Sequence, residues 1–481
     1  MRRFTTACLP IVLCLCFPVV PSLAEPTAVS APAGGAAAKP APACRRVIAT
    51  DYPTLQDAVN ALPDRTGEVY LPAGNYVLTK TLDLSYPSGG YKGGIKLVGA
   101  GRTTKIVAAT KGQPAIDLTG ANHCIIQDLN IEAEGNLVKP ADAPNIGLLL
   151  ARNPSGHAAQ EHRFTNVNII GRFTIANVYN ITSELDRFVG CIFINTAPGS
   201  HNMVFSSDNY AGVESPYRGK IKTLYSNTEL RIIGCSFYNW GGGKGGSNLY
   251  MRGFTMDVTV RDCYMNPPAG GNGVRLGMSS KGGPVRGAVF DGIRVEADNS
   301  SDVFRIEGNA ANITIRECRV FYGEGKALNA DSVSFLTFEN NDCWNIRGWK
   351  TAVHAGAMSN SRIVGNLFKF DNWGGKNPQD AAPLAVSVQR SMGNHIQVPS
   401  RELARLGWVV RTVIDATDDG GVRRRYLGDF ATGETLNLTP VNTAKLKGMK
   451  RGDVALDDGT NTASKKPGLA VYDGAAWVYM N

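Results

Sequence analysis

Apolar and polar residues alternate in short runs along this chain, and the runs recur. One six-residue pattern reads apolar, any residue, small or polar, cysteine or apolar, any residue, apolar; its clearest copy is IRECRV at residues 315–320. From Cys235 to Cys318, successive copies are 28, 30 and 25 residues apart. Alternation with period 2 predicts strands in which every second side chain faces inward. The other copies begin at Ile126, Phe164, Phe188, Ile232, Val260 and Phe290, with weaker copies at Phe338 and Ile363.

A second pattern, apolar–polar–apolar, lies between the copies of the first. Its steps are 25, 30, 24, 25 and 33 residues, which match the period of the first pattern. Two ladders with matching periods predict a β-solenoid, in which each coil contributes several short strands. The residues at the centres of its copies, which we expect to face outward, are Tyr250, Arg275, Arg305, Asn329, His354 and Ser387.

Cysteine recurs at one position of the first pattern, as Cys191, Cys235, Cys263 and Cys318. Stacked coils would place these side chains in one interior column, where cysteine serves as a small apolar residue. A metal site or disulfides are the alternatives, but stacked side chains point in parallel, which is poor geometry for a disulfide. We therefore expect these cysteines to be unpaired, buried and structural.

The segment before the repeats has the features of a cap. Thr54 and Asp57 resemble a capping box, which would open a short amphipathic helix through Leu62. Pro63 would end that helix. A solenoid must cover its first open coil, and this helix is placed to do so.

Three segments carry a family resemblance: YPTLQDAVNALP (52–63), GEVYLPAGNYVL (67–78) and IKLVGAGRTTKI (95–106). Together they resemble the N-terminal module of the pectate-lyase-like superfamily, which is shared with tailspike-type polysaccharide depolymerases. The resemblance implies a right-handed parallel β-helix that acts on polysaccharides. The superfamily includes lyases, hydrolases, uronate epimerases and non-catalytic members, so it indicates the fold more strongly than the activity. No cofactor is expected from the residues, and calcium enters by the resemblance alone.

The expected domain order has four parts. Residues 1–24 read as a signal peptide, with Arg2 and Arg3 before a short apolar run, although a membrane anchor is the alternative. Residues 25–43 are an Ala/Pro-rich linker, and residues 44–395 form the β-helix. The repeats stop near residue 395, and 396–481 read as a small C-terminal β module for trimerisation, glycan binding or capping. We expect an exported protein, periplasmic or secreted, without a membrane span.

The outward residues of the second pattern are the candidate site, and the resemblance places the substrate groove on the same face. Two residues further along each strand lie Arg252, Glu307 and Asp331, beside the column of Arg275 and Arg305. Stacked arginines repel each other unless an anion lies between them. Their planar guanidinium groups can bind a carboxylate through two parallel hydrogen bonds. The alternative is that Glu307 and Asp331 already satisfy both arginines.

Two mechanisms could use these residues. In β-elimination on a uronate polymer, Arg275 and Arg305 would neutralise the carboxylate, and His354 or Tyr250 would move the proton. A uronate epimerase would share this first step.

Hydrolysis needs two carboxylates. Glu307 and Asp331 are the only two acids at outward positions on neighbouring strands of the second pattern. No complete signature of a characterised lyase or polygalacturonase is present, which leaves a non-catalytic glycan-binding or surface protein as an alternative.

Two similar loops add candidate binding residues. One contains Trp240 and Lys244, the other Trp373 and Lys376. A tryptophan face could carry a sugar ring and a lysine an acidic group, with Asn329 of the column as a further binding residue. The alternative is that each tryptophan packs over the edge of the solenoid.

Composition narrows the choice of partner. The 481 residues include 54 glycines and only 19% charged residues, as many turns and few exposed helices would give. The hydrophobic fraction of 43% excludes a disordered chain. A formal charge of +9 suggests an anionic partner. No phosphate loop, dinucleotide fingerprint or zinc spacing occurs, and nucleic acid does not suit an exported chain. We therefore expect a lyase for an acidic polysaccharide.

Overall fold

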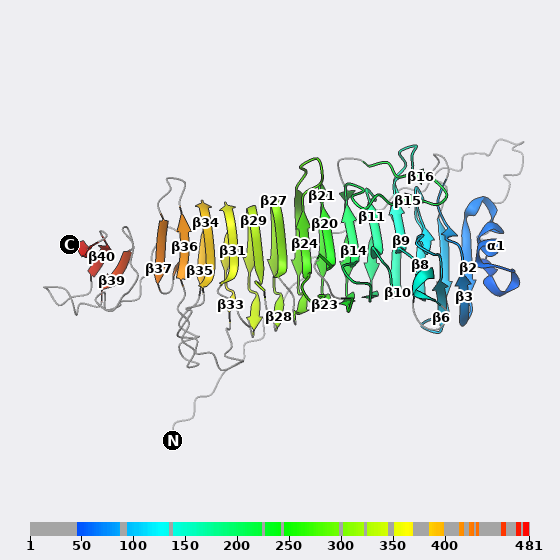
Figure 1. The fold of residues 1–481 in the computed structure, drawn as a ribbon, viewed down its shortest axis with the longest axis horizontal. Coiled ribbons are helices and arrows are strands. Elements are labelled where there is room, and N and C mark those ends of the chain that lie inside the picture. The colour runs from blue at the N-terminus through cyan, green and yellow to red at the C-terminus, as the bar shows by residue number, and fades with distance from the viewer. Residues whose placement is uncertain are drawn as a thin grey trace, which may run out of the picture. The chain divides into compact units, whose positions relative to one another are not determined.

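Parallel strands stacked along one axis make up most of the computed structural model (Figure 1). The structure describes residues 46–86, 94–133, 138–223, 227–241, 245–297, 302–321, 325–344, 351–368, 384–398, 413–417, 423–427, 430–431, 454–457, 468–472 and 475–480.

Each coil of the solenoid runs through three parallel ladders, which we call A, B and C. The pairing within every ladder joins each strand to its equivalent one coil away, so the predicted all-β parallel β-helix is confirmed. Ladder A consists of β4 (Leu82–Asp83), β7 (Ile116–Asp117), β9 (Ile146–Ala151), β11 (Ala176–Ile181), β14 (His201–Ser206), β20 (Ser247–Arg252), β24 (Asn272–Gly277), the first parts of β27 (Asp302–Arg316) and β29 (Leu328–Glu339), β31 (Thr351–Ser359), β34 (Leu384–Met392) and β36 (Val413–Thr417).

Ladders B and C follow ladder A in each coil. Ladder B consists of β1 (Arg46–Ile48), β2 (Gly67–Leu71), β5 (Ile95–Gly99), the first parts of β8 (Ile125–Ala133) and β10 (Arg163–Gly171), β12 (Arg187–Val189), β18 (Arg231–Ile233), β22 (Val258–Arg261), β25 (Val285–Asp291), the second parts of β27 and β29, β32 (Arg362–Val364) and β35 (His395–Val398). Ladder C consists of β3 (Gly74–Leu78), β6 (Thr104–Ala108), the second parts of β8 and β10, β13 (Ile192–Asn195), β19 (Ser236–Asn239), β23 (Tyr264–Asn266), β26 (Arg294–Glu296), β28 (Arg319–Phe321), β30 (Asp342–Trp344) and β33 (Leu367–Phe368).

The first repeated pattern marks the turn from ladder B to ladder C. Its third position, which is small or polar in most copies, adopts left-handed backbone geometry in coil after coil. Glycine, asparagine and aspartate tolerate that geometry best, whereas a β-branched residue would be strained there. The residue types at this position therefore reflect the need for left-handed backbone geometry. The φ angles lie between +53° and +65° at Asp128, Asn166, Gly190, Gly234, Asp262, Gly292, Glu317, Asn340 and Gly365.

The cysteine column lies directly after this turn, inside the core. The described cysteines are free and buried, as the structural interpretation of the column predicted. Asparagine takes over the position toward the C-terminus: Asn341 Oδ1 accepts from the Cys318 N–H, and Asn366 Oδ1 accepts from the Asn341 N–H, each at 3.0 Å. These amides keep the buried backbone N–H groups of the turn hydrogen-bonded.

The N-terminal cap forms as predicted. Helix α1 (Leu55–Asn60) starts at Thr54, whose Oγ1 accepts from the Asp57 N–H at 3.1 Å. The helix ends two residues before the expected Leu62, which still packs in the core. Short 3-10 turns lie at η1 (Ala49–Asp51), η2 (Pro63–Arg65) and η3 (Pro140–Asp142).

Parallel stacking continues beyond the expected boundary at residue 395. β36 pairs in parallel with β34, so ladder A extends to Thr417 before β37 (Arg423–Leu427) and β38 (Phe430–Ala431) add antiparallel pairs. β39 (Val454–Asp457), β40 (Gly468–Tyr472) and β41 (Trp477–Met480) form a separate antiparallel sheet. The expected signal peptide and linker lie outside the described residues. No helix in the described part of the chain is long and apolar enough to cross a membrane.

A long excursion between β14 and β18 covers part of the outer face of ladder A. We call residues 207–223 the covering segment; it contains β15 (Glu214–Ser215) and β16 (Gly219–Lys220), which Figure 1 shows beside β9. Beneath it lies an apolar cluster outside the main core, with Leu149, Tyr179 and Val204 from the ladder and Val213 from the segment. Its far end reaches the first coils, where the Tyr217 hydroxyl donates to the Thr81 carbonyl. A parallel pair, β17 (Asn227–Thr228) and β21 (Thr255–Met256), lies nearby in sequence.

Candidate functional site

The outward residues of the second pattern form one column on ladder A, in the predicted order. Backbone pairing joins Tyr250, Arg275, Arg305, Asn329, His354 and Ser387 on successive rungs. We call this row the ladder A column. Because neighbouring strands lie about 4.8 Å apart, Tyr250 and His354 are separated by about 19 Å of stacked backbone.

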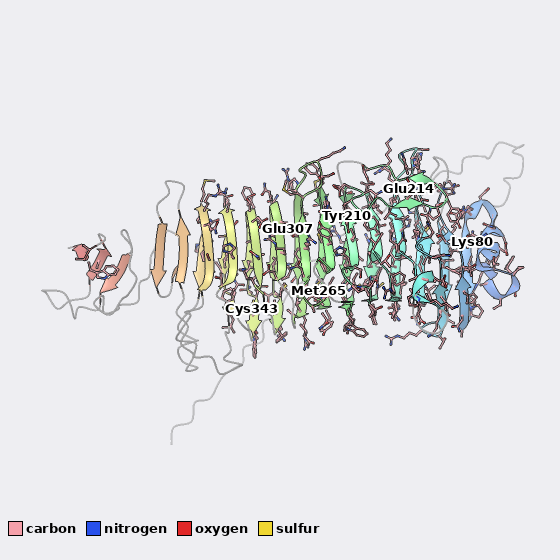
Figure 2. The ribbon with its side chains drawn as sticks, viewed as in Figure 1. Lys80, Tyr210, Glu214, Met265, Glu307 and Cys343 are labelled. Atoms are coloured by element: carbon pink, nitrogen blue, oxygen red, sulfur yellow. The ribbon has the colours of Figure 1, made fainter. Side chains whose placement is uncertain are left out.

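The covering segment ends where the cationic part of the column begins. Tyr250 belongs to the covered apolar cluster, whereas Arg275 and Arg305 on the next two rungs are only partly buried. Figure 2 labels Tyr210 of the covering segment and Glu307 of β27 along the same edge of the solenoid, with Met265 and Cys343 of ladder C on the other edge. The exposed part of the ladder A face therefore starts at β24.

Arg275 is held on three sides. Its Nε and Nη2 both lie 2.9 Å from Glu307 Oε2. Its guanidinium carbon lies 4.6 Å from the centre of the Tyr250 ring, a cation–π distance. Its Nη1 donates to the Gly245 carbonyl at 3.2 Å. The guanidinium is therefore fixed in place before any ligand arrives.

Arg305 pairs with Asp331 at 2.6 Å. Asp331 Oδ2 also accepts from the Gly308 N–H at 2.9 Å. Partial burial acts to raise the pKa of Asp331, but the Gly308 N–H and the Arg305 charge outweigh burial and lower that pKa below its ordinary value. Asp331 is therefore a carboxylate at neutral pH. Both ion pairs correspond to the alternative in which the acids satisfy the arginines.

The register of β27 is irregular beside these acids. The register between β27 and β29 shifts between Ile306 and Asn309. Gly308 lies in the shift with φ +71°, and a Cβ there would come within 2.3 Å of Met278 Sδ. Glycine adopts this backbone without strain and without displacing the Met278 side chain.

His354 is the titratable group of the column suited to accepting a proton. Burial lowers its pKa below the ordinary value, and the nearby charges of Lys326 and Arg305 lower it further. The imidazole is therefore neutral at pH 7, the state that a general base requires. On the preceding rung, the Asn329 amide donates to Asp302 Oδ2 at 2.8 Å, which orients its carbonyl oxygen.

The side chains of Tyr250 and Arg252 are packed against neighbouring residues. Tyr250 is 5% exposed, and its ring lies 5.0 Å from that of His201 and 5.7 Å from that of Tyr210. Arg252 pairs with Asp208 at 3.0 Å and lies 4.9 Å from the centre of the Tyr210 ring. Burial lowers the pKa of His201 to about 3, with Arg275 adding to the effect. These positions favour support of Arg275 over proton transfer by Tyr250 or substrate binding by Arg252.

The remaining candidate residues are not brought to the column. Trp240 is 64% exposed at the end of β19, and its described ring contact is with Tyr238 of ladder C. Lys244, Trp373 and Lys376 lie outside the described residues. Among the described residues, no group of three or more His, Cys, Asp or Glu side chains is placed to hold a metal ion.

Four neighbours of the column were missed from the sequence: Asp208, Tyr210, Asp302 and Lys326. Asp208 and Tyr210 belong to the covering segment, which follows no repeat. The only sequence signal for it is the spacing from Cys191 to Cys235, which is clearly longer than the later steps. That spacing indicates an insertion without indicating where it folds.

Some solved structures are similar to this chain, whereas no protein-family model and no curated protein matches its sequence. Among solved structures, the Azotobacter vinelandii mannuronan C-5 epimerase AlgE4 A-module is 12% identical, with a TM-score of 0.49 over 73% of this chain and 95% of that one. PfbA, a surface adhesin of Streptococcus pneumoniae, is 10% identical, with a TM-score of 0.49 over 78% of this chain and 91% of that one.

A third similar structure is the catalytic domain of a GH87 α-1,3-glucanase, 15% identical, with a TM-score of 0.42 over 74% of this chain and 70% of that one. These likenesses concern the fold alone.

Proposed function

We propose that this chain is an exported lyase that cleaves a uronate-containing polysaccharide by β-elimination at the ladder A column. The supporting observation is that Arg275, Arg305, Asn329 and His354 stack on successive rungs of one partly exposed face. Carboxylate-binding groups and a neutral imidazole thus lie along a single line. A polymer aligned with that line would meet both within a span of a few rungs.

In the proposed reaction, Arg305 pairs with the carboxylate of the reacting uronate. That charge offsets the negative charge that develops when the proton α to the carboxylate leaves. His354 takes the proton, and the electrons of the C–H bond form a C=C bond as the β C–O bond breaks. The departing oxygen takes a proton from water. One product ends in an unsaturated uronate, and the other has a new reducing end.

The two internal ion pairs set a condition on this reaction. A substrate carboxylate must displace Asp331 from Arg305, or bind the guanidinium edge that Asp331 leaves open. Asp331 is 49% exposed in its side chain, so it can move into water at low cost. Arg275 is held more firmly, and in the proposal it binds the carboxylate of a neighbouring sugar.

Hydrolysis by Glu307 and Asp331 fits these contacts less well. A two-carboxylate mechanism needs one carboxyl group that is protonated near neutral pH. The lowered pKa of Asp331 favours its ionised form, and the carboxylate of Glu307 is already engaged by two nitrogens of Arg275. A uronate epimerase would share the proton abstraction and differ in returning a proton to the opposite face.

A non-catalytic glycan-binding protein is the second candidate. The observation that favours it is that Arg275 and Arg305 already have acid partners. Such a surface could bind a polymer through its polar groups without activating a C–H bond.

Product analysis distinguishes these functions. The mature protein would be incubated with polygalacturonate, alginate and bacterial exopolysaccharides, and we expect new ultraviolet absorbance from an unsaturated uronate. New reducing ends without that absorbance would indicate hydrolysis, and a changed uronate configuration in an intact chain would indicate epimerisation. Binding without any product would refute the enzyme. Arg305→Ala should abolish turnover, whereas Arg319→Ala on ladder C should not.

Export and assembly belong to the same proposal. The first 24 residues support export, and a cleaved chain beginning at Glu25 in the mass spectrum of secreted protein would test it. The C-terminal sheet β39–β41 is the proposed trimerisation or glycan-binding module. Light scattering of the full chain with and without residues 440–481 would test the trimer.

A further inference from the structure

A second row of cations runs along the outer face of ladder B, away from the ladder A column. Backbone pairing places Arg163 opposite Arg187, and Arg187 opposite Arg231, on consecutive rungs. Lys96 lies in the same row, with Ile125 between it and Arg163. We call Lys96, Arg163, Arg187 and Arg231 the ladder B row.

The arginines of the ladder B row differ from those of the ladder A column in forming no ion pair with an acid among the described residues. Glu68 lies opposite Lys96 in register and pairs with Arg46 at 3.0 Å. Arg163 and Arg187 are exposed. Arg231 donates to the Asp257 carbonyl at 2.6 Å and to Thr259 Oγ1 at 3.1 Å, both neutral groups. Like charges opposite each other on neighbouring strands are destabilising. The fold nevertheless keeps three arginines in register there, and an anion bound across them would relieve their repulsion.

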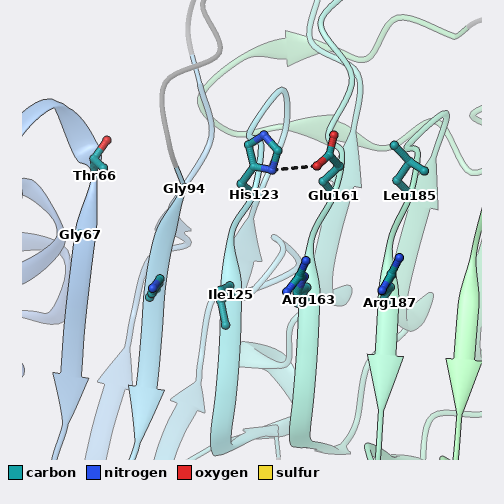
Figure 3. A pocket seen from close by; sticks show the side chains of 10 residues that line it. Thr66, Gly67, Gly94, His123, Ile125, Glu161, Arg163, Leu185 and Arg187 are labelled. Carbon is teal, nitrogen blue, oxygen red and sulfur yellow. Dashed lines mark ion pairs between the residues drawn. The ribbon is translucent and has the colours of Figure 1, made fainter. Parts of the chain in front are cut away.

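A groove lies over the N-terminal part of this row. Its volume is about 540 Å³, and its lining includes Lys96, Arg163 and Arg187. Figure 3 shows the two arginines side by side, below an ion pair between His123 and Glu161 at 3.0 Å. The lining holds one acid, Glu161, against three cations, Lys96, Arg163 and Arg187. The groove is therefore cationic at neutral pH.

An apolar row borders the cations. Two residues along each strand from Arg187 and Arg231 lie Val189 and Ile233, which pair with each other and are 40% and 39% exposed. Exposed β-branched side chains on successive rungs offer a flat apolar surface. A pyranose ring that carries a carboxylate has the complementary pair of features, an apolar C–H face beside a planar anion.

We propose that the ladder B row is a second, non-catalytic binding site for a uronate polysaccharide strand. The guanidinium groups of Arg163 and Arg187 bind successive carboxylates through their paired N–H groups, Lys96 extends the site as a point charge, and the sugar rings lie against Val189 and Ile233. This site is independent of catalysis at ladder A. It would hold the polymer near the enzyme between cleavage events.

The test is binding to polygalacturonate by isothermal titration at low salt, with the full chain carrying His354→Gln so that the polymer is not cleaved. Dextran serves as the neutral polymer and polyphosphate as an anion without sugar rings. Arg163→Gln/Arg187→Gln should weaken polygalacturonate binding about tenfold, because two partly exposed ion pairs are lost. Arg172→Gln/Arg319→Gln removes the same charge from exposed arginines elsewhere and should leave affinity unchanged. Arg163→Lys/Arg187→Lys keeps the positive charge but loses the paired N–H groups of the guanidinium. Its affinity for polygalacturonate should lie between that of the unchanged ladder B and that of Arg163→Gln/Arg187→Gln.

Several outcomes would overturn the proposal. The first is no binding of polygalacturonate by the chain with ladder B unchanged. The others are equal weakening by the two glutamine variants, and tighter binding of polyphosphate than of polygalacturonate. Turnover of a short uronate oligomer, which ladder A alone would bind, should be the same in Arg163→Gln/Arg187→Gln as in the wild type. Loss of that turnover with intact polymer binding would count against ladder B as a separate site.

Discussion

The ion pair between Arg305 and Asp331 offers a sharp perturbation of the ladder A column. Asp331→Asn removes the negative charge and keeps an oxygen that can accept from the Gly308 N–H. The Arg305 and Asp331 side chains are 21% and 49% exposed. A pair exposed to this degree contributes about 0.2–1 kcal/mol, so unfolding free energy should fall by no more than about 1 kcal/mol.

The same change should raise affinity for the polymer, because Asp331 and a substrate carboxylate compete for one guanidinium. Release of Arg305 can add up to about 1 kcal/mol to binding, which is about a fivefold decrease in Kd. Titration of the variant with a uronate oligomer, alongside a chemical denaturation curve, measures both quantities.

Asp291→Asn is the matched control. Asp291 pairs with Arg316 at 2.9 Å on the outer face of ladder B, so the Asp291→Asn variant loses an equivalent ion pair outside the column. Its affinity for the oligomer should not change. Weaker binding by Asp331→Asn, or loss of turnover with unchanged binding, would refute the competition and assign the Asp331 carboxylate a direct role.

Acid titration adds a second readout for this pair. The pKa of Asp331 is lower in the folded chain than its ordinary value of 3.8. The pair therefore stabilises the fold at pH values above about 4, and this contribution is lost as the pH falls through the lowered pKa. Asp331→Asn should lack this part of the acid-induced loss of stability.

Three further predictions concern protonation and backbone geometry. His354→Gln should lower turnover by about 10²–10⁴-fold, whereas Ser387→Ala on the next rung should have little effect. The acidic limb of the wild-type pH–rate profile should lie below pH 6.5, because the pKa of His354 is lowered from that value. Burial raises the pKa of Asp186 from 3.8 to about 7, so stability should decline as the pH rises across that interval; Asp186→Asn should flatten the slope, whereas Asp51→Asn should not. Gly234→Val should destabilise the fold by about 1–2 kcal/mol, measured by denaturation, because Gly234 has φ +62°, and Gly234→Asn should cost less.

Much of the fold could be predicted because each coil repeats the same requirements. Alternation fixed which side chains of the second pattern face outward, and the backbone register then follows from stacking. The third position of the first pattern, as at Asn166 and Gly234, carries a left-handed backbone requirement that shows directly in the residue type. Such local constraints are legible in one sequence.

The candidate site could be predicted only in part. The column was predicted in its correct order, and its pairing with Glu307 and Asp331 was one of the alternatives drawn from the spacing. The contact of Arg275 with the Gly245 carbonyl comes from a loop outside the repeat, which no periodicity encodes. Burial of Tyr250 depends on Tyr210, from a segment that follows no repeat. The ladder B row was not recognised, because Arg163 and Arg187 lie before their copies of the pattern, at positions where residue type varies.

The most direct test of catalysis at ladder A is a crystal structure of His354→Gln, prepared to prevent turnover, with a uronate oligosaccharide. We expect a sugar carboxylate within hydrogen-bonding distance of Arg305 and a ring over Asn329, with the carbon that loses its proton facing position 354. A ligand bound only on ladder B or ladder C, or an empty ladder A column at a saturating oligosaccharide concentration, would contradict the proposed function.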